Sequence, residues 1–325
     1  MRTLITKILK RLDTAVLSPG WTKAWFHWLL WALIIVPAAA WGDIRLVLSD
    51  SSPHYQQIAE DIGLYLEKFH PGVRHSRSVT GAVGEIATTD ELIVAIGTKA
   101  AEGAAKDYPD NPALYLFITH KTWGILNNSR GKKAAIIIDQ PTERYLQLAR
   151  LIAPDARTLG TVYGPISANH RDQFQATAIE LGFELVSQSI TRESNPLEAI
   201  SPIFNVSDIF IALPDEALIN RNLAQWALHL GFKNQIPIIG FSHSYTKAGA
   251  LASIFTSPEN VSRQSLEWLN DYLDTNTPPA WQELSPQYFT ITVNRRVMGA
   301  LGLRLDTKEL TAKMSPWDTT VQPDE

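Results

Sequence analysis

Residues 91–105 read ELIVAIGTKAAEGAA, and this stretch combines a strand, a break and the start of a helix. Leu92–Ile96 is a continuous apolar run rich in β-branched residues, which is typical of a strand buried on both faces. The Ala-rich segment that follows predicts a helix. In open α/β sheets, ligands bind beyond the carboxyl ends of such strands. Gly97 would let a ligand approach the backbone and Thr98 is a candidate helix N-cap, so both are candidate binding residues.

The same alternation continues along the chain and predicts an α/β fold with two doubly wound parallel-sheet lobes. One series of strands ends near Asp139 and a second begins near Thr158. Strands are expected at 44–49, 73–79, 92–96, 114–118, 134–138, 158–163, 183–190, 208–213, 236–239, 250–255 and 288–293. Helices are expected at 54–69, 99–105, 141–153, 168–181, 196–204, 215–230, 242–248, 258–273 and 295–302. We expect a loop at 122–133 and a polar, disordered tail at 306–325.

The composition excludes several classes of function. The 325 residues include no cysteine, which excludes disulfides, thiol catalysis and a lipid-modified cysteine. The net charge of −4 argues against a nucleic-acid partner, because phosphate contacts need clustered cations. Neither a GxGxxG nor a GxxxxGK[ST] loop is present, and no histidine pair has metal-ligand spacing. We therefore expect no cofactor and no metal.

Residues 1–42 have the order of a secretory signal. Residues 1–40 contain five Lys or Arg and one Asp, and the apolar segment AWFHWLLWALIIVPAAA at 24–40 ends in small residues. We expect cleavage near Ala40 and a periplasmic body. An uncleaved inner-membrane anchor is the alternative, because the apolar run is at the short limit for a membrane span.

Polar side chains follow several predicted strands, at the starts of helices. A zwitterionic solute needs N–H and hydroxyl donors for its carboxylate and an acid for its ammonium group. Asp215 suits the second role, with a helix N-cap as its alternative. The candidate donors at strand ends are Ser51, Ser52, Thr98, Ser167, Asn169, Ser242 and His243, and the candidate aromatic walls are Tyr55, Trp123, Tyr163, Phe241 and Tyr245. Ser242-His243-Ser244 lacks the pattern of a nucleophile elbow, so we do not expect an enzyme.

Four segments together resemble a known family. They are LIVAIGTKAAEGAA, PDARTLGTVYGPISANHRDQFQATAIELGFEL, IPIIGFSHSYTKAGALASIF and ITVNRRVMGALGLRL. In this order they resemble the substrate-binding proteins of ABC importers for tryptophan or other small, often aromatic, solutes. The resemblance implies the type I periplasmic-binding-protein fold, with lobes at 43–139 plus 244–275 and at 140–243 plus 280–305, joined by three crossing segments. It implies solute contacts at Gly97, Thr98, Ser167, Asn169, Asp215, Phe241 and Ser242.

Two functions remain open at this point. The first is a monomeric periplasmic protein that binds an amino acid or aromatic compound between its lobes and delivers it to an inner-membrane ABC permease. The second is a sensory or accessory module on the same fold that reports to a receptor, a kinase or an outer-membrane transport system. The second alternative arises because the GPIS turn and the loop ILNNSRGKKAAIII depart from the family's usual pattern.

Overall fold

The computed structural model describes residues 43–81, 88, 90–128, 130–191, 193–215, 218, 221–275, 281–314 and 319–323. The predicted leader at 1–42 lies outside these residues. Within them, none of the helices combines the length and apolar character that a membrane span requires.

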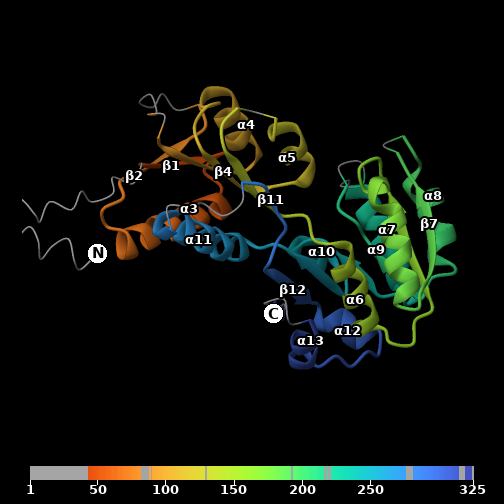
Figure 1. Ribbon diagram of the computed structural model, residues 1–325. Helices are drawn as coiled ribbons and strands as arrows, with labels where there is room; N and C mark the ends of the chain where they lie inside the picture. Colours follow the sequence, from red (N-terminus) through yellow and green to blue (C-terminus); the bar gives the residue numbers. More distant parts are fainter. Residues whose placement is uncertain are drawn as a thin grey trace, which may run out of the picture. The chain divides into compact units, whose positions relative to one another are not determined.

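The first sheet has six strands in the order β11-β5-β4-β3-β1-β2 (Figure 1). All of its pairs are parallel, as the continuous apolar runs predict. The strands are β1 (Ile44–Leu48), β2 (His75–Val79), β3 (Leu92–Ile96), β4 (Ala113–Ile118), β5 (Lys133–Ile137) and β11 (Glu283–Leu284). The helices in this part of the sequence are α3 (Pro53–Phe69), α4 (Thr98–Asp107) and α5 (His120–Leu126).

The second sheet repeats this order. Its seven strands run β13-β12-β10-β9-β8-β6-β7, so the first five strands of each sheet follow the pattern 2-1-3-4-5 of a doubly wound fold. β12 is antiparallel to β10, whereas the other pairs are parallel. The strands are β6 (Thr158–Tyr163), β7 (Glu184–Ser189), β8 (Ile209–Ile211), β9 (Ile238–Gly240), β10 (Ala252–Phe255), β12 (Phe289–Val293) and β13 (Thr319–Pro323). The helices are the 3-10 turn η1 (Ser167–His170), α6 (Thr142–Ile152), α7 (Arg171–Glu180), α8 (Pro196–Phe204), α9 (Arg221–Asn234), α10 (His243–Ala248), α12 (Arg295–Ala300) and α13 (Thr307–Met314).

Helix α11 (Pro258–Thr275) lies beside α3, although the two are about 200 residues apart in sequence (Figure 1). The Tyr65 hydroxyl donates to Asn270 Oδ1 at 2.8 Å, and Gln57 Nε2 donates to Glu259 Oε1 at 2.9 Å. The backbone N–H of Asn260 donates to Ser257 Oγ, so Ser257 caps the start of α11. The chain therefore returns to the first sheet after it has built β10 of the second.

The chain passes between the two sheets three times, after β5, after β10 and after β11. Gln140 Nε2 donates to Thr256 Oγ1 at 2.6 Å, and that hydroxyl donates to the Ile138 carbonyl at 3.0 Å. Arg144 Nη1 donates to Gln140 Oε1 at 2.7 Å, and its Nη2 lies 3.4 Å from the Gln287 carbonyl oxygen. These bonds connect residues at all three crossings.

The sequence-based boundaries of the lobes need two corrections. Residues 280–305 were assigned to the second lobe as one block, but β11 at 283–284 pairs with β5 of the first sheet. Residues 244–275 were assigned to the first lobe as one block, but β10 pairs with β9 and β12 of the second sheet. Leu251, Ala252 and Ile254 are buried in the core of that sheet, so the chain cannot leave it before Phe255. The crossing accordingly lies at Thr256–Ser257, where the hydrogen bonds described above are found.

Two segments predicted to be irregular form helices. Thr119 Oγ1 accepts a hydrogen bond from Thr122 N and caps α5, whose Trp123 and Leu126 are buried one turn apart. The prediction of a loop at 122–133 overlooked this cap. The first residues of that segment, up to Leu126, form the end of α5 instead. In the predicted tail, Leu310 and Met314 are 3% and 1% exposed and join the core of the second sheet. Their i, i+4 spacing is the signal that the polar composition obscured.

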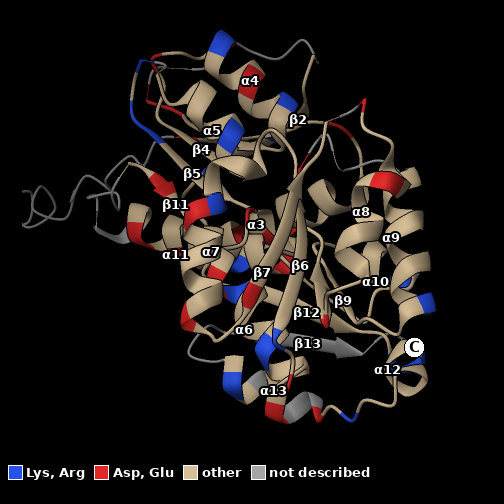
Figure 2. Ribbon diagram, turned by 90° about the vertical axis from the view of Figure 1, so that its right-hand side faces the viewer, with Lys and Arg blue, Asp and Glu red and all other residues tan. Residues whose placement is uncertain are grey.

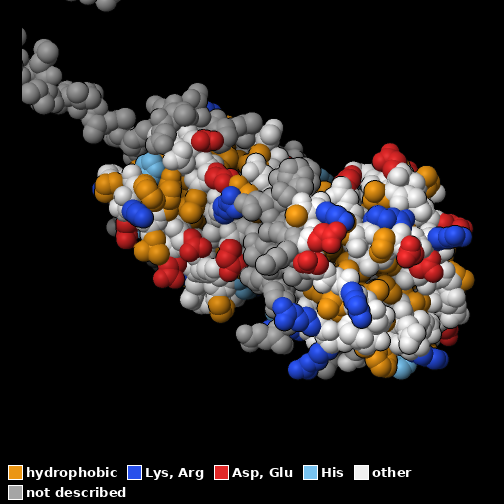
Figure 3. All heavy atoms as spheres, turned by 90° about the horizontal axis from the view of Figure 1, so that it is seen from below, with side chains coloured by type: hydrophobic (Ala, Val, Ile, Leu, Met, Phe, Trp, Pro, Cys, Tyr) orange, Lys and Arg blue, Asp and Glu red, His pale blue; other side chains and the backbone are white. Residues whose placement is uncertain are grey.

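The surface carries charges of both signs. Lys and Arg are interspersed with Asp and Glu over the helices in Figure 2, and hydrophobic side chains lie scattered among charged ones in Figure 3. The edge strands β2 and β7 have the polar sequences HSRSV and ELVSQS and are mostly exposed or half-buried.

We expect Leu310→Ala to lower the free energy of unfolding by about 2–5 kcal/mol, because it deletes a buried side chain from a packed core. Lys313→Ala on the same helix should change it by less than about 0.5 kcal/mol, since its ion pair with Glu309 is exposed. Urea unfolding measures both. Equal stabilities of the two variants would show that α13 is not part of the core.

Candidate functional site

A cavity of about 730 Å³ lies where strands of the two sheets end. Its residues follow β4 and β5 of the first sheet and β6 and β8 of the second, which is the edge at which open α/β sheets bind ligands. The volume is within the range of small-molecule sites. The residues that line it include Thr119, His120, Lys121, Asp139, Thr142, Glu143, Tyr145, Tyr163, Ile166, Ser167, Asn169, His170, Phe174, Asp215, Glu283 and Ser285.

On the side of the second sheet, Asp215 holds the turn after β6 in place. Its Oδ2 accepts hydrogen bonds from Ile166 N at 2.8 Å, Ser167 N at 2.7 Å and Ser167 Oγ at 3.0 Å. Asp215 is 3% exposed. A Cβ at Gly164 would lie 2.4 Å from the Asp215 carboxylate, so only glycine fits this close approach. The loop and the carboxylate are therefore one interlocked unit.

On the side of the first sheet, Asp139 follows β5 and accepts a hydrogen bond from His120 N at 2.7 Å. Burial raises the pKa of Asp139, and the nearby Glu283 carboxylate acts in the same direction, while the His120 contacts oppose the rise. The His120 ring Nδ1 lies 2.8 Å from Glu283 Oε1. This wall thus gathers two carboxylates and an imidazole.

Aromatic rings form a third part of the lining. Tyr145 and Tyr163 are 3% and 0% exposed, and the Tyr163 ring meets Phe174 edge to face at 6.0 Å. Burial raises the pKa of Tyr163 to about 12, with Arg171 acting in the opposite direction. Burial and, after it, the Asp139 carboxylate raise the pKa of Tyr145. Both phenols are therefore neutral at pH 7. Among the described residues, the Tyr163 hydroxyl has no hydrogen-bond partner.

Of the predicted binding residues, Ser167, Asn169 and Asp215 line this cavity. Asp215 lies six residues before Arg221, the first residue of α9, and its Oδ2 is bonded to the turn at 166–167. Tyr163 is the predicted aromatic residue that lines it. These four side chains come from two strand ends of the second sheet.

Gly97 and Thr98 do not line the cavity. The space beside Gly97 is filled, because a Cβ there would lie 2.5 Å from Ser49 Oγ and 2.7 Å from the Tyr55 ring. Thr98 is the first residue of α4 rather than its N-cap. Ser49 Oγ accepts from Ala100 N at 3.0 Å and supplies the cap from the neighbouring strand end. The glycine is thus needed for internal packing.

The remaining predicted residues also lie outside the cavity lining. Ser51 is exposed, and Ser52 is the N-cap residue of α3 and donates to the Asp50 carboxylate. Ser242 caps α10 by accepting from Tyr245 N at 3.2 Å. The Phe241 ring lies 5.4 Å from that of Tyr245 and packs against the core.

Sequence reasoning did not select Asp139, Glu143 or Glu283 as site residues, although all three line the cavity. In the sequence, Asp139 is the residue near which the first series of strands ends. Its place directly after an apolar strand is the signal that could have identified it as a site residue. Glu283 carried no such signal, because β11 has only two residues and follows a chain crossing. Among the described residues, no cluster of His, Asp and Glu has the composition of a metal site.

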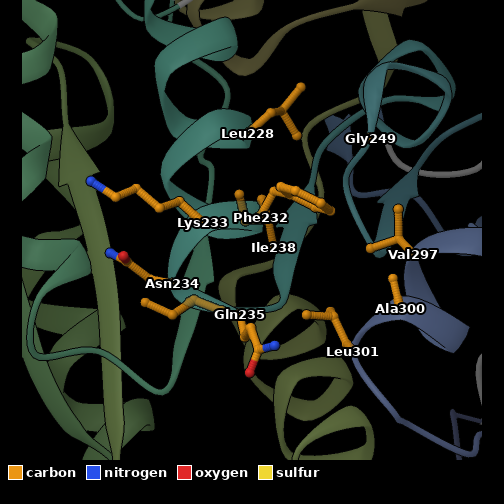
Figure 4. A pocket seen from close by; sticks show the side chains of 12 residues that line it. Leu228, Phe232, Lys233, Asn234, Gln235, Ile238, Gly249, Val297, Ala300 and Leu301 are labelled. Carbon is orange, nitrogen blue, oxygen red and sulfur yellow. The ribbon is translucent and has the colours of Figure 1, made fainter.

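A second cavity, of about 450 Å³, lies between α9, the start of β9 and α12 (Figure 4). Leu228, Phe232 and Leu301 contribute apolar side chains, and the Lys233 side chain extends away from them. Its residues Ile236 and Ile238 lie at the amino end of β9, at the edge of the sheet opposite to the strand ends. Its lining contains no carboxylate, and its polar side chains are those of Lys233, Asn234 and Gln235.

A family model described as "ABC transporter substrate binding protein" matches residues 78–310, more than half of the chain. The chain belongs to this family. The family comprises non-enzymatic proteins that bind a small solute for an ABC transporter, and such proteins are typically extracytoplasmic. The substrate-binding protein described here finds no match in a search of curated protein sequences.

Solved structures share its fold. A ligand-free, open substrate-binding protein with adhesive properties from Clostridium difficile matches with a TM-score of 0.63 at 18% identity, covering 87% of this chain and 100% of that one. An ABC domain in complex with L-Trp from Streptococcus pneumonia matches with 0.54 at 16% identity, covering 86% and 99%. A conserved domain protein from Vibrio cholerae matches with 0.55 at 15% identity, covering 87% and 100%. The type I binding-protein fold expected from the sequence is thereby confirmed.

We expect Asp215→Ala to destabilise the substrate-binding protein by about 3 kcal/mol or more, because it leaves three hydrogen-bond donors near Ser167 without their acceptor. Asp155→Ala, in an exposed turn, is the matched control and should change stability by less than about 0.5 kcal/mol. Denaturant unfolding compares them. A cost for Asp215→Ala no larger than that of the control would contradict the interlocked turn.

We expect Asp139→Asn to raise the melting temperature at pH 7. The pKa of Asp139 is raised in the folded protein, so ionisation of this carboxyl costs folding free energy above the pKa of the unfolded chain. The gain should shrink as the pH falls towards about 4, where the carboxyl becomes protonated in both states. Melting curves from pH 3.5 to 7.5 measure it, with Asp155→Asn as the control. A gain independent of pH would exclude the charge as its cause.

Proposed function

We propose that this substrate-binding protein binds a small organic solute, an amino acid or an aromatic compound, in the cavity lined by Asp139, Tyr163 and Asp215. The observation that carries the proposal is a cavity of suitable volume at the strand ends of a family fold, lined by aromatic rings and by a few charged groups. A neighbour in fold was solved in complex with L-Trp, which supports an aromatic solute.

The proposal assigns the solute contacts to two hinged lobes. One is built on the first sheet with α11, and the other on the second sheet. Asp139 and Glu283 belong to the first, and Tyr163, Asn169 and Asp215 to the second. A solute that contacts both sets stabilises a closed arrangement over an open one in proportion to the contacts made only on closure. The bonded crossings near Gln140 and Thr256 are the hinge in this proposal.

The proposal also assigns the site of action. The body acts in the periplasm after export through the leader at 1–42, and it delivers its solute to an inner-membrane ABC permease as a monomer. The basic start, the apolar segment and the small residues before Gly42 support export.

Thermal-shift screening of the purified protein against amino acids, aromatic acids and aromatic amines tests the solute proposal. A solute present at 100 times its Kd adds about 2.7 kcal/mol of stability, which raises the melting temperature by several degrees. Asn169→Trp should abolish the shift, because Asn169 is exposed in the cavity and an indole fills the space. Asn205→Trp, on an exposed helix end outside the cavity, should keep it. No shift at millimolar concentrations of any solute would refute the proposal.

A further inference from the structure

We propose that the cavity selects solutes that carry a cationic amine on an apolar or aromatic skeleton and that it disfavours solutes with a free carboxylate. This inference rests on the proposed function and narrows its solute class. It is carried by the carboxylates that line the cavity, by the backbone N–H groups they already occupy, and by the unpartnered hydroxyl of Tyr163.

The backbone N–H groups at the strand ends are where an α/β sheet ordinarily binds the anionic group of a ligand. Ile166 N and Ser167 N donate to the Asp215 carboxylate, and His120 N donates to the Asp139 carboxylate. These distances are 2.7–2.8 Å, so the bonds are fully formed. The protein's own acids therefore occupy positions that a solute carboxylate would need, in both sheets.

The lining of the cavity is predominantly acidic. The acidic residues of the described lining are Asp139, Glu143, Asp215 and Glu283. Apart from histidine, its basic residue is Lys121. The described lining includes no arginine that could clamp a carboxylate with two parallel bonds. A solute carboxylate would thus enter an acidic surrounding, whereas an ammonium group would be attracted to it.

Aromatic rings lie beside these acids. Tyr145, Tyr163 and Phe174 line the cavity and suit an apolar or aromatic skeleton, while the Arg171 guanidinium already lies over the Tyr163 ring, 4.8 Å from its centroid. The Tyr163 hydroxyl is buried and neutral at pH 7, and it lacks a partner among the described residues. Its oxygen can accept a hydrogen bond from an ammonium N–H. A buried hydroxyl that lacks a partner among the described residues is a position at which a bound solute can supply one.

A metal ion fits this lining less well than an organic cation does. The described residues contain no group of three His, Asp or Glu arranged to hold a metal. Glu283 is paired with His120, and Glu143 Oε1 accepts from Gln173 Nε2 at 2.9 Å. Aromatic rings and single carboxylates spaced around a cavity of about 730 Å³ suit a larger ion with diffuse contacts.

Three compounds of one skeleton separate charge from shape: phenethylamine, phenylalanine and hydrocinnamate. They carry an amine, an amine with a carboxylate, and a carboxylate alone. Isothermal titration of the purified full chain at pH 7 should show phenethylamine binding at least tenfold more tightly than phenylalanine. Hydrocinnamate should show no measurable binding. The same order should hold for tryptamine, tryptophan and indole-3-propionate.

Two variants assign the selectivity to residues. Asp139→Asn keeps an oxygen for His120 N but removes the charge, so it should weaken phenethylamine at least tenfold without lowering the melting temperature. Glu180→Gln removes one negative charge from the exposed end of α7, as Asp139→Asn removes one from the cavity. It should change the affinity for phenethylamine less than twofold. Tyr163→Phe should weaken binding of the amine about threefold or more while leaving stability unchanged, since its hydroxyl has no hydrogen-bond partner among the described residues.

The outcomes distinguish this inference from the proposed function. Tighter binding of phenylalanine or hydrocinnamate than of the amine, or an unchanged order in Asp139→Asn, would overturn the cation selectivity while solute binding stands. The cation selectivity would also be overturned if the thermal-shift screen found a solute that binds and carries a carboxylate but no amine. Absence of binding by every solute in that screen would refute the proposed function, and the inference with it.

Discussion

The hydrogen bond from Gln140 to Thr256 joins two of the three places where the chain passes between its sheets, and the cavity depends on it. Thr256 passes the contact on to the Ile138 carbonyl, and Asp139 lies between these two bonded positions in the sequence. Arg144 extends the same network to the third crossing through Gln140 and Gln287. Its pKa is lowered to about 10 by burial, so the guanidinium remains charged at neutral pH and keeps its donors. This network of hydrogen bonds holds the strand ends of both sheets in position.

Both walls of the cavity are built on the same chemical device. A carboxylate that follows one strand accepts the backbone N–H groups of the turn that follows a neighbouring strand: Asp139 for His120, and Asp215 for Ile166 and Ser167. This arrangement satisfies donors that would otherwise face solvent or ligand. It fixes the turns without help from a solute. Because the acceptors are carboxylates, the turns present negative charge to the cavity. The lining is therefore acidic, although the fold alone does not require an acidic lining.

The fold was predictable because its signals are local. All five residues of β3 are buried, as their apolar run indicates, and Pro53 and Ser257 mark helix starts as their residue types predict. The site was predictable only in part. Gly97 has the residue type of a binding loop, but whether its open side faces a ligand or Tyr55 depends on tertiary packing. Asp215 was found from its place after a strand, yet its bonds to the turn 49 residues away leave no trace in the sequence. Glu283 lies on a strand too short to be recognised.

The polar edge strands have a consequence for how this protein behaves at high concentration. A sheet edge offers unpaired backbone groups to any other extended chain, and long apolar edges promote aggregation. Here β2 closes one sheet with His75, Ser76, Arg77 and Ser78, and β7 closes the other with Glu184 at its start. A second molecule that paired with β2 would have to desolvate the Arg77 guanidinium beside its own backbone. These two edges are thereby protected against strand-by-strand polymerisation, while the buried strands beside them remain as apolar as the core requires.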